Sequence, residues 1–122
     1  MKVAICSSNG ISVNMHFGKT STFYIYDFRG EERIFLEKRE VRPFSQGKFF
    51  YLDDARFHPF NKDHFAQVYA TICDCELICT SCIGHTPKRK LSEKGHKIHE
   101  CKGPITNIPT HIHLAKFNYY LS

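Results

Sequence analysis

Short runs of apolar residues, bounded by polar or turn-forming residues, divide the chain into alternating elements. Five segments have the apolar runs, or the enrichment in aromatic and β-branched residues, that are typical of β-strands. The second and third segments are expected to form a hairpin, because Gly30 and its polar neighbours can make the turn between them. The five predicted strands are 2–6, 22–28, 34–41, 76–80 and 97–101.

Three other segments repeat apolar residues at helical spacing. We expect the first helix to begin at Asn61, which can cap its first turn. The second helix has the clearest boundaries, since Thr86 can cap it, Pro87 suits the first helical position and Gly95 can close it. The third is expected to start near Pro109, because a proline interrupts any longer helix.

The predicted order is three strands followed by helix, strand, helix, strand and helix. Strands that alternate with helices are typical of a sheet with helices packed against it, which here indicates a mixed sheet. Residues 43–59 fit no period, and we interpret them as a long excursion. With 122 residues and no internal repeat or linker, the chain is predicted to form a single α/β domain, 1–122.

Composition narrows the class of protein further. Hydrophobic residues make up 42% of the chain and aromatic residues 14%, which is typical of a globular protein. The apolar run after Met1 is too short for a signal-peptide core or a membrane span, so we expect a cytoplasmic protein. In that reducing compartment the six cysteines are expected to be free thiols, buried small side chains or metal ligands rather than disulfides.

Four of the cysteines lie close together in the sequence, at Cys73, Cys75, Cys79 and Cys82. Soft thiolates at this density could hold zinc or an iron–sulfur cluster. The run, however, crosses from a predicted helix end into a predicted strand, and a structural zinc site usually has two separated pairs of ligands. We therefore favour an interpretation in which Cys73 and Cys79 lie in the core while Cys75 and Cys82 are loop thiols.

The His-Phe-Gly motif at 16–18 lies between an Asn9-Gly10 turn and an aromatic strand. A histidine in that position can present its imidazole at the edge of a sheet, where thiolates from elsewhere in the chain could join it on a metal. By itself the histidine would not indicate a metal site. The cysteines elsewhere in the chain strengthen the interpretation of this motif as part of a metal site.

The sequence offers little for catalysis. A nuclease needs acidic residues that converge on metal ions, whereas the first predicted strand ends in Cys6 and the aspartates are scattered. The sequence contains no phosphate-binding glycine loop. Cys6 with His16 would form a nucleophile–base pair that lacks a third group to orient the base. We therefore expect a protein that is not an enzyme.

Several motifs follow one another in an order that can be compared with known families. They lie at 2–5, 8–10, 13–18 and 23–26 in the first half, and at 73–75, 83–84, 87, 91, 94–95 and 103–105 in the second. Together they resemble the dinitrogenase iron–molybdenum cofactor biosynthesis family, the small domain found in NifX and NafY and at the C-terminus of NifB. The chain departs from many relatives at 43–47, which holds no cysteine, and at Pro109, which interrupts the last helix.

The resemblance implies a ribonuclease-H-like α/β fold with a mixed five-stranded sheet flanked by helices. It also implies non-catalytic binding or carriage of an iron–sulfur or iron–molybdenum cofactor, or its precursor, with metallocluster assembly or acceptor proteins as partners. His16 matches the family's histidine and is expected at the cluster pocket, where a neutral imidazole is an exchangeable ligand. The residues expected to contact the cofactor are His16, Cys6, Phe17 and Gly18, and those expected to bind metal are His16, Cys79 and Cys82.

Two other functions stay open. The fold could serve as a protein-interaction or regulatory module without a cluster, which predicts scattered thiols and a large apolar surface patch. Less favoured is a nucleic-acid-binding domain that uses the basic segment 88–102, a large contributor to the net charge of +5, with an affinity that falls steeply with salt. A solvated helix surface is the favoured explanation of that segment. A cluster carrier instead predicts that His16 and a thiol converge on one pocket.

Overall fold

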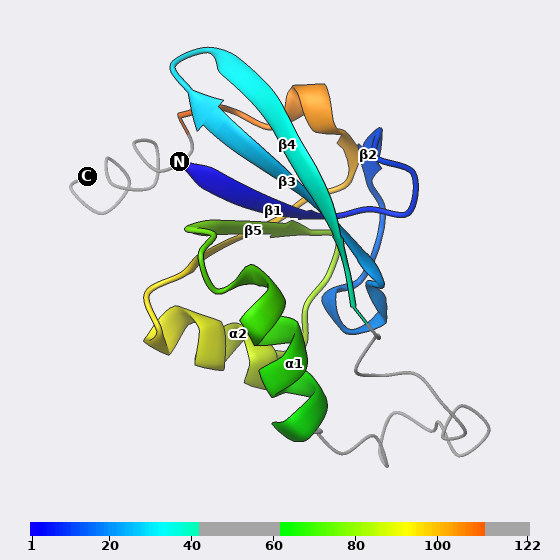
Figure 1. Ribbon diagram of the computed structural model, residues 1–122, viewed down its shortest axis with the longest axis vertical. Coiled ribbons are helices and arrows are strands. Elements are labelled where there is room, and N and C mark those ends of the chain that lie inside the picture. The colour runs from blue at the N-terminus through cyan, green and yellow to red at the C-terminus, as the bar shows by residue number, and fades with distance from the viewer. Residues whose placement is uncertain (42–61, 112–122) are drawn as a thin grey trace.

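The computed structural model describes residues 1–41 and 62–111, and a five-stranded sheet forms its centre (Figure 1). The strands are β1 (Lys2–Cys6), β3 (Thr22–Arg29), β4 (Glu32–Glu40), β5 (Leu77–Thr80) and β6 (Lys97–Glu100). Their order across the sheet is β4-β3-β1-β5-β6. β3 is antiparallel to both of its neighbours, whereas β1, β5 and β6 run parallel. The predicted mixed five-stranded sheet is therefore confirmed.

Each strand expected from the apolar pattern is present, with bounds that differ from the prediction by two residues or fewer. The hairpin between β3 and β4 turns at Gly30, whose φ of 56° is in the left-handed region that favours glycine. The interior strands are the most apolar, because helices and loops cover both of their faces. Four of the five residues of β1 have no access to solvent, and only Lys2 at its start is partly exposed.

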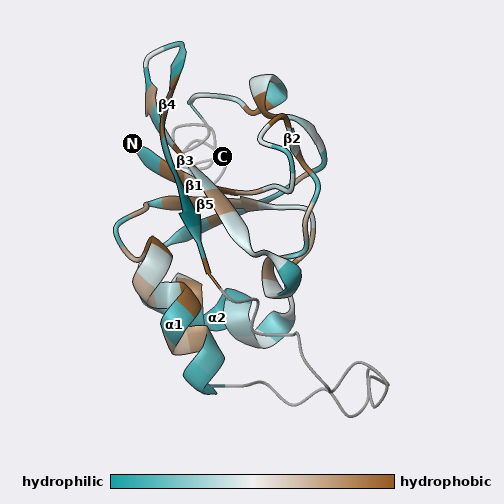
Figure 2. Ribbon diagram, turned by 45° about the vertical axis from the view of Figure 1, so that its right-hand side comes forward, coloured by the Kyte–Doolittle hydropathy of each residue, from teal (hydrophilic) through white to brown (hydrophobic). Residues whose placement is uncertain are grey.

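Two helices, α1 (Lys62–Ile72) and α2 (His85–Glu93), cover one face of the sheet (Figure 1). Phe65, Val68 and Ile72 recur on one side of α1 and are buried against the sheet, as is Leu91 of α2. The strand residues that they meet are Ala4, Cys6, Phe23, Ile25 and Ile78. Figure 2 shows hydrophobic stretches along the central strands, while much of the outer surface of the helices is hydrophilic.

Local sequence predicts the C-terminal end of α2 correctly but not its N-terminal end. Gly95 has a φ of 93°, and the N–H groups of Gly95 and His96 donate to the carbonyls of Ser92 and Leu91, both at 3.0 Å. This pairing is a Schellman motif, so the predicted closure at Gly95 is confirmed. The predicted cap at Thr86 is wrong, because α2 already begins at His85 and its N-cap residue is Gly84. The backbone after β5 enters the helix at His85, which is earlier than a side-chain cap at Thr86 would place the start.

The opposite face of the sheet carries a second, two-stranded sheet that the apolar pattern does not predict. It pairs β2 (Ser12–Val13) with β7 (Gly103–Pro104), and a 3₁₀ turn over Ile105–Asn107 follows it. Two-residue strands are too short to produce a period of alternating residues. Their role is to cover the sheet, since Val13, Ile105 and Ile108 pack on a cluster formed by Val3, Ile5, Leu77 and Cys79.

Some predictions fall outside the described residues. The excursion at 43–59 and the cap at Asn61 belong to the segment 42–61, and most of the predicted last helix belongs to 112–122. In the part of the chain that the structure describes, neither helix has the length and apolar character needed to cross a bilayer.

An ion-pair network ties the end of α1 to the sheet. Asp74 accepts hydrogen bonds from Arg39 of β4 on both carboxylate oxygens, at 2.6 and 3.1 Å, and from the Lys2 ammonium at 2.9 Å. Arg39 also donates to the carbonyl of Thr71 in the last turn of α1, at 2.9 Å. The bonds from Arg39 and Lys2 hold the pKa of the Asp74 carboxyl well below its usual range. A paired Arg–carboxylate contact of this kind is geometrically specific.

We expect Asp74→Asn to lower the free energy of unfolding by about 1 kcal/mol near pH 7, an estimate reduced for the solvent access of the pair. A carboxylate whose pKa is lowered by folding stabilises the protein above its unfolded pKa of about 4, and that contribution is lost as the pH falls further. Urea unfolding near pH 7 and near pH 3 should therefore show a difference between wild type and variant that shrinks in acid. Glu93→Gln, in the exposed pair with Arg89, serves as the control. A pH-independent difference would contradict this account.

Candidate functional site

The candidate site lies where the carboxyl ends of β1 and β5 meet. These strands are parallel neighbours, so the loops that leave them emerge at the same edge of the sheet. The loop after β1 spans 7–16 with the short β2 inside it, and the segment 81–84 leads from β5 into α2. Carboxyl ends of parallel strands are where open α/β sheets most often bind ligands.

The first loop is held in shape by its own polar side chains. The Ser7 hydroxyl, which is buried, accepts the Gly10 N–H at 2.9 Å. The Asn9 side-chain oxygen accepts the N–H groups of Ile11 and Ser12 at 2.8 and 3.0 Å. Gly10 has a φ of 74°, so the turn predicted at Asn9-Gly10 is confirmed. Short Ser and Asn side chains stabilise turns in this way, and here they make a rigid platform ahead of His16.

His16 and Cys82 lie side by side at this edge. Their backbones pair in an isolated parallel β-bridge, and the Phe17 N–H donates to the Cys82 carbonyl at 2.9 Å. The Thr20 hydroxyl donates to the His16 carbonyl at 2.7 Å, which holds the histidine backbone from its other side. Both His16 and Cys82 are exposed. The bridge thereby pairs two residues that both have exposed side chains, one with an imidazole and one with a thiol.

Thr80, which is fully buried, holds the two loops in contact. Its hydroxyl lies 2.9 Å from the carbonyl oxygen of Met15 and 3.0 Å from that of Cys82. The Ser81 N–H adds a bond to the Met15 carbonyl at 3.1 Å. Sequence reasoning missed this positioning role of Thr80. Its partner Met15 is 65 residues away in the chain, and no local signal marks the contact.

Phe17 anchors the motif in the core. Its side chain is 1% exposed, and its ring centroid lies 6.1 Å from that of Phe23 and 6.5 Å from that of Phe65. The buried phenyl ring therefore fixes the backbone next to His16. Gly18 follows in the 3₁₀ turn Phe17–Lys19. Both were predicted to contact a cofactor. Phe17 packs in the core, and its predicted contact with a cofactor, like that of Gly18, stays a prediction.

The other predicted thiols lie inside the protein. Cys6 belongs to the helix-side core, and Cys79 belongs to the core on the opposite face of the sheet. Burial raises the pKa of the Cys6 thiol to about 11, and it raises the pKa of the Cys79 thiol well above its usual value. Metal ligation needs the thiolate, which burial in an apolar core disfavours. Of the predicted ligands, the structure brings Cys82 to His16 and leaves Cys6 and Cys79 buried.

The four closely spaced cysteines at 73, 75, 79 and 82 do not come together as one metal site in the described part of the chain. Cys73 is exposed just past the end of α1, and Cys75 is 1% exposed, so the predicted assignment of one to the core and the other to a loop is reversed for this pair. Burial raises the pKa of the Cys75 thiol to about 12. The helix ends with core residue Ile72, which leaves the next residue outside. Within the described residues, no three His, Cys, Asp or Glu side chains are arranged to hold one metal ion.

Comparison with known proteins assigns the chain to a family. Residues 1–114 match the family described as dinitrogenase iron-molybdenum cofactor. The chain is 30% identical over 93 residues to the FeMo cofactor biosynthesis protein NifB of Klebsiella pneumoniae, a match that covers 76% of this chain and 19% of NifB. The crystal structure of PH0822 shares the fold, with a TM-score of 0.63 at 20% identity, covering 95% of this chain and 92% of that one. The chain belongs to the dinitrogenase iron–molybdenum cofactor family.

Proposed function

We propose that this domain binds an iron–sulfur or iron–molybdenum cofactor, or its precursor, at His16 and Cys82 and passes it on without catalysing a reaction. The observation that carries the proposal is the backbone bridge that pairs His16 with Cys82, two residues that are both exposed. The family is associated with iron–molybdenum cofactor metabolism, which supports a metal cluster as the cargo. Metallocluster assembly and acceptor proteins are the expected partners.

The chemistry of the pair suits a temporary attachment. Imidazole nitrogen and thiolate sulfur are both good ligands for the iron of clusters. Because two protein ligands leave most of the cluster uncovered, an acceptor protein can supply its own ligands before the donor releases its hold. Both side chains are exposed, so the cluster would remain open to that exchange. A closed set of four ligands would hold it permanently instead.

We further infer that the fold is ribonuclease-H-like, as the family resemblance implies. The order β4-β3-β1-β5-β6, with β3 antiparallel to its neighbours, supports this inference. In such a fold an acidic residue on the first strand would indicate metal-dependent hydrolysis. Here that strand ends in Cys6, which supports a binding role over a nuclease.

Cluster loading tests the proposal directly. Wild type, His16→Ala and Cys82→Ala are purified without oxygen and reconstituted with iron and sulfide, with and without molybdate, and the iron, sulfide and molybdenum retained per chain are measured. We expect stoichiometric uptake by wild type and a loss of about tenfold or more in cluster affinity for each variant. Cys73→Ala is the matched control, since this exposed thiol precedes β5 whereas Cys82 follows it. Absence of uptake by wild type, or uptake equal in all four proteins, would rule the proposal out.

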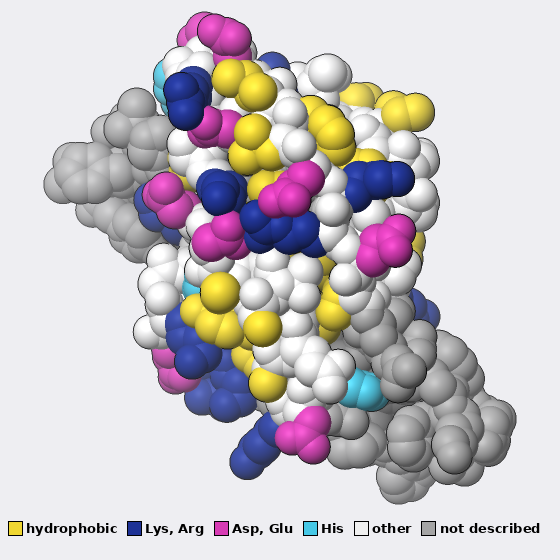
Figure 3. All heavy atoms as spheres, viewed as in Figure 1, with side chains coloured by type: hydrophobic (Ala, Val, Ile, Leu, Met, Phe, Trp, Pro, Cys, Tyr) yellow, Lys and Arg dark blue, Asp and Glu magenta, His cyan; other side chains and the backbone are white. Residues whose placement is uncertain are grey.

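A second candidate is a protein-interaction module that carries no cluster. Three consecutive apolar residues of β4, Ile34, Phe35 and Leu36, are 39%, 50% and 45% exposed. Figure 3 shows hydrophobic side chains gathered over the β3–β4 hairpin, among positive and negative ones. Exposed apolar patches often mark interaction sites. Cluster loading separates the two candidates, because this module would bind no iron.

A further inference from the structure

β4 differs from the inner strands of the sheet because most of its side chains reach solvent. It is the last strand in the order β4-β3-β1-β5-β6, and of its residues only Arg33 and Arg39 are partly buried. The apolar centre of β4 consists of Ile34, Phe35 and Leu36, each of which is more than a third exposed. Three large apolar residues exposed in a row are typical of an interaction surface.

The charged residues on the two sides of this apolar centre have opposite signs. From Phe35 toward the N-terminus, the first charge is positive, at Arg33, and the next is negative, at Glu32. From Phe35 toward the C-terminus, the first charge is negative, at Glu37, and the next is positive, at Lys38. Figure 3 shows charged side chains of both signs around the hydrophobic ones over the hairpin. The strand is therefore complementary to a second copy of itself that runs in the opposite direction.

One antiparallel alignment sets each of these charges against an opposite charge. It has Phe35 facing the Phe35 of the other copy, and the remaining facing pairs are Glu32–Lys38, Arg33–Glu37 and Ile34–Leu36. An axis one residue later sets Arg33 against Arg39. An axis one residue earlier sets Glu31 against Glu37, and a parallel alignment sets every charge against itself. Because like charges opposite each other are destabilising, the pattern selects a two-fold axis at Phe35.

An irregularity in β4 limits how two copies can meet. Opposite β3 the pairing passes from Ile25–Glu37 directly to Tyr26–Phe35, so Leu36 is the extra residue of a β-bulge. A bulge bends the strand, changes the alternation of faces and interrupts the ladder of backbone hydrogen bonds. Bulges also protect the edges of sheets from indiscriminate pairing. We therefore assign the contact between copies to side chains and not to a sheet that continues from one copy into the other.

Phe35 is suited to the middle of this contact. Its ring lies against two tyrosines of β3, with centroid distances of 5.4 Å to Tyr26 and 6.3 Å to Tyr24, while half of the residue reaches solvent. These contacts hold the ring in position before a partner arrives, which reduces the ordering cost of association. Central aromatic side chains surrounded by more polar residues contribute much of the binding energy in many interfaces.

We propose that two copies of this chain associate through β4, antiparallel across a two-fold axis at Phe35. The apolar centres pack on each other, and the exposed Glu32 of each copy pairs with the exposed Lys38 of the other. Arg33 contributes less, because its guanidinium already donates to the carbonyl of Ile108 within its own copy, at 2.6 and 3.0 Å. A contact confined to one strand is smaller than the roughly 1,600 Å² of a standard interface, so we expect a weak, reversible dimer.

Exchange of charge at the Glu32–Lys38 pair tests the proposal. Wild type, Glu32→Lys and Lys38→Glu are compared by sedimentation equilibrium from about 10 µM to 1 mM full chain, with a thiol reductant and without iron. We expect wild type to dimerise in this range and each variant to dimerise about tenfold more weakly, because it sets like charges across the axis. An equimolar mixture of the two variants restores both opposite pairs, so its heterodimer should recover that loss of about tenfold.

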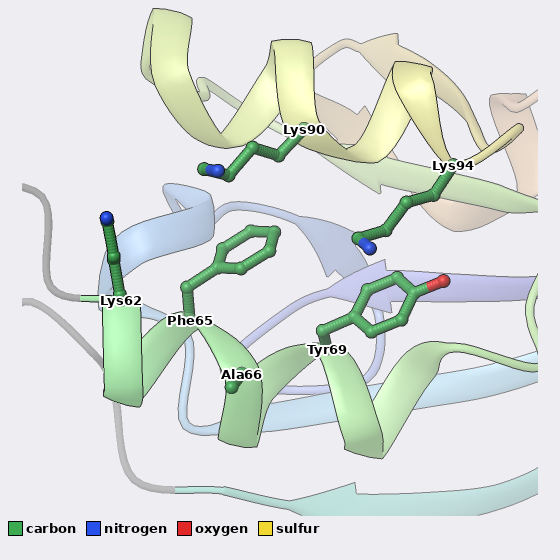
Figure 4. Close-up of a pocket in the computed structure, with 6 residues that line it drawn as sticks. All are labelled: Lys62, Phe65, Ala66, Tyr69, Lys90 and Lys94. Atoms are coloured by element: carbon green, nitrogen blue, oxygen red, sulfur yellow. The ribbon is translucent and has the colours of Figure 1, made fainter.

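Two further variants separate the β4 contact from attraction by overall charge. Phe35→Ser should weaken dimerisation by about tenfold or more, since it removes the central ring. Lys94→Glu changes the charge of the chain as Lys38→Glu does, but in the helix layer. There the ammonium of Lys94 lies 5.2 Å from the centre of the Tyr69 ring (Figure 4). This control should alter dimerisation by less than about twofold.

The remaining outcomes overturn the proposal. A wild type that is still monomeric at about 1 mM would show that β4 does not bind a second copy. A mixture that fails to recover dimerisation would refute the pairing of Glu32 with Lys38. Equal effects of Lys94→Glu and Lys38→Glu would reduce the association to overall charge, and dimers unaffected by Phe35→Ser would place the contact elsewhere. The dimer uses neither His16 nor Cys82, so failure of the cluster proposal would not change these results.

Discussion

Phe17→Ala is expected to lower the free energy of unfolding by about 3–5 kcal/mol, the largest effect among the substitutions considered. The Phe17 ring is 1% exposed and lies between Phe23 of β3 and Phe65 of α1. Removing it leaves a cavity between the sheet and the helix that the flanking rings can fill only in part. A native domain of this size is stable by about 5–15 kcal/mol, so a large share of the total would be lost.

Equilibrium unfolding in urea measures the change. Phe35→Ala is the matched control, because this phenylalanine is 50% exposed on β4 and should contribute about 1 kcal/mol or less through its contacts with neighbouring tyrosines. If the two alanine variants were equally stable, the Phe17 ring would not have the core position that anchors the loop. Phe17→Leu, which keeps most of the buried volume, should recover much of the loss.

Gly10→Ala is expected to lower the free energy of unfolding by about 2–4 kcal/mol, for two additive reasons. With a φ of 74°, Gly10 has a backbone conformation that side chains disfavour. A Cβ atom added there would also lie 2.5 Å from Cε2 of the Tyr24 ring, which is closer than carbon atoms can approach. Either the Tyr24 ring or the loop would have to shift, and a shift of the loop would displace the backbone ahead of His16.

The chain supplies a control that separates the two reasons. Gly30 also has a positive φ, of 56°, yet an added Cβ would meet nothing within 4 Å. Gly30→Ala should therefore show only the conformational penalty, about 1 kcal/mol. Thermal or urea unfolding of both variants gives the difference between them, which we assign to the Tyr24 contact. Equal destabilisation of the two variants would refute that assignment. Cluster loading of Gly10→Ala should also fall if the loop positions His16.

The two leading functions predict different arrangements of the thiols, and the molecule has features of both. A carrier requires His16 and a thiol in one place; the backbone bridge pairs His16 with Cys82, and cluster binding by the two stays a prediction. An interaction module predicts scattered thiols and an apolar patch. Cys73 and the β4 side chains match that description. The iron-loading experiment is therefore the decisive one for function.

Much of the fold could be read from short windows of the chain. The five strands of the main sheet and the end of α2 at Gly95 depend on residues within a few positions of one another, such as the apolar run of β5 or the positive φ that only glycine adopts readily. The family resemblance also rests on motifs of this local kind. Where the pattern was too short, as in β2 and β7, the same method predicted nothing.

The candidate site depends on contacts between residues that are far apart in the sequence, so no short stretch of the chain contains both partners. Cys79 and Cys82 are three positions apart, yet one is buried beneath the sheet and the other is at the surface beside His16. That difference arises because β1 and β5 pair in parallel and Thr80 closes their two loops together. Local sequence specified the elements and the histidine motif, since these follow from steric and hydrophobic preferences of neighbouring residues. Which thiol meets His16 was decided only by packing between distant segments, because burial and pairing are properties of the whole sheet.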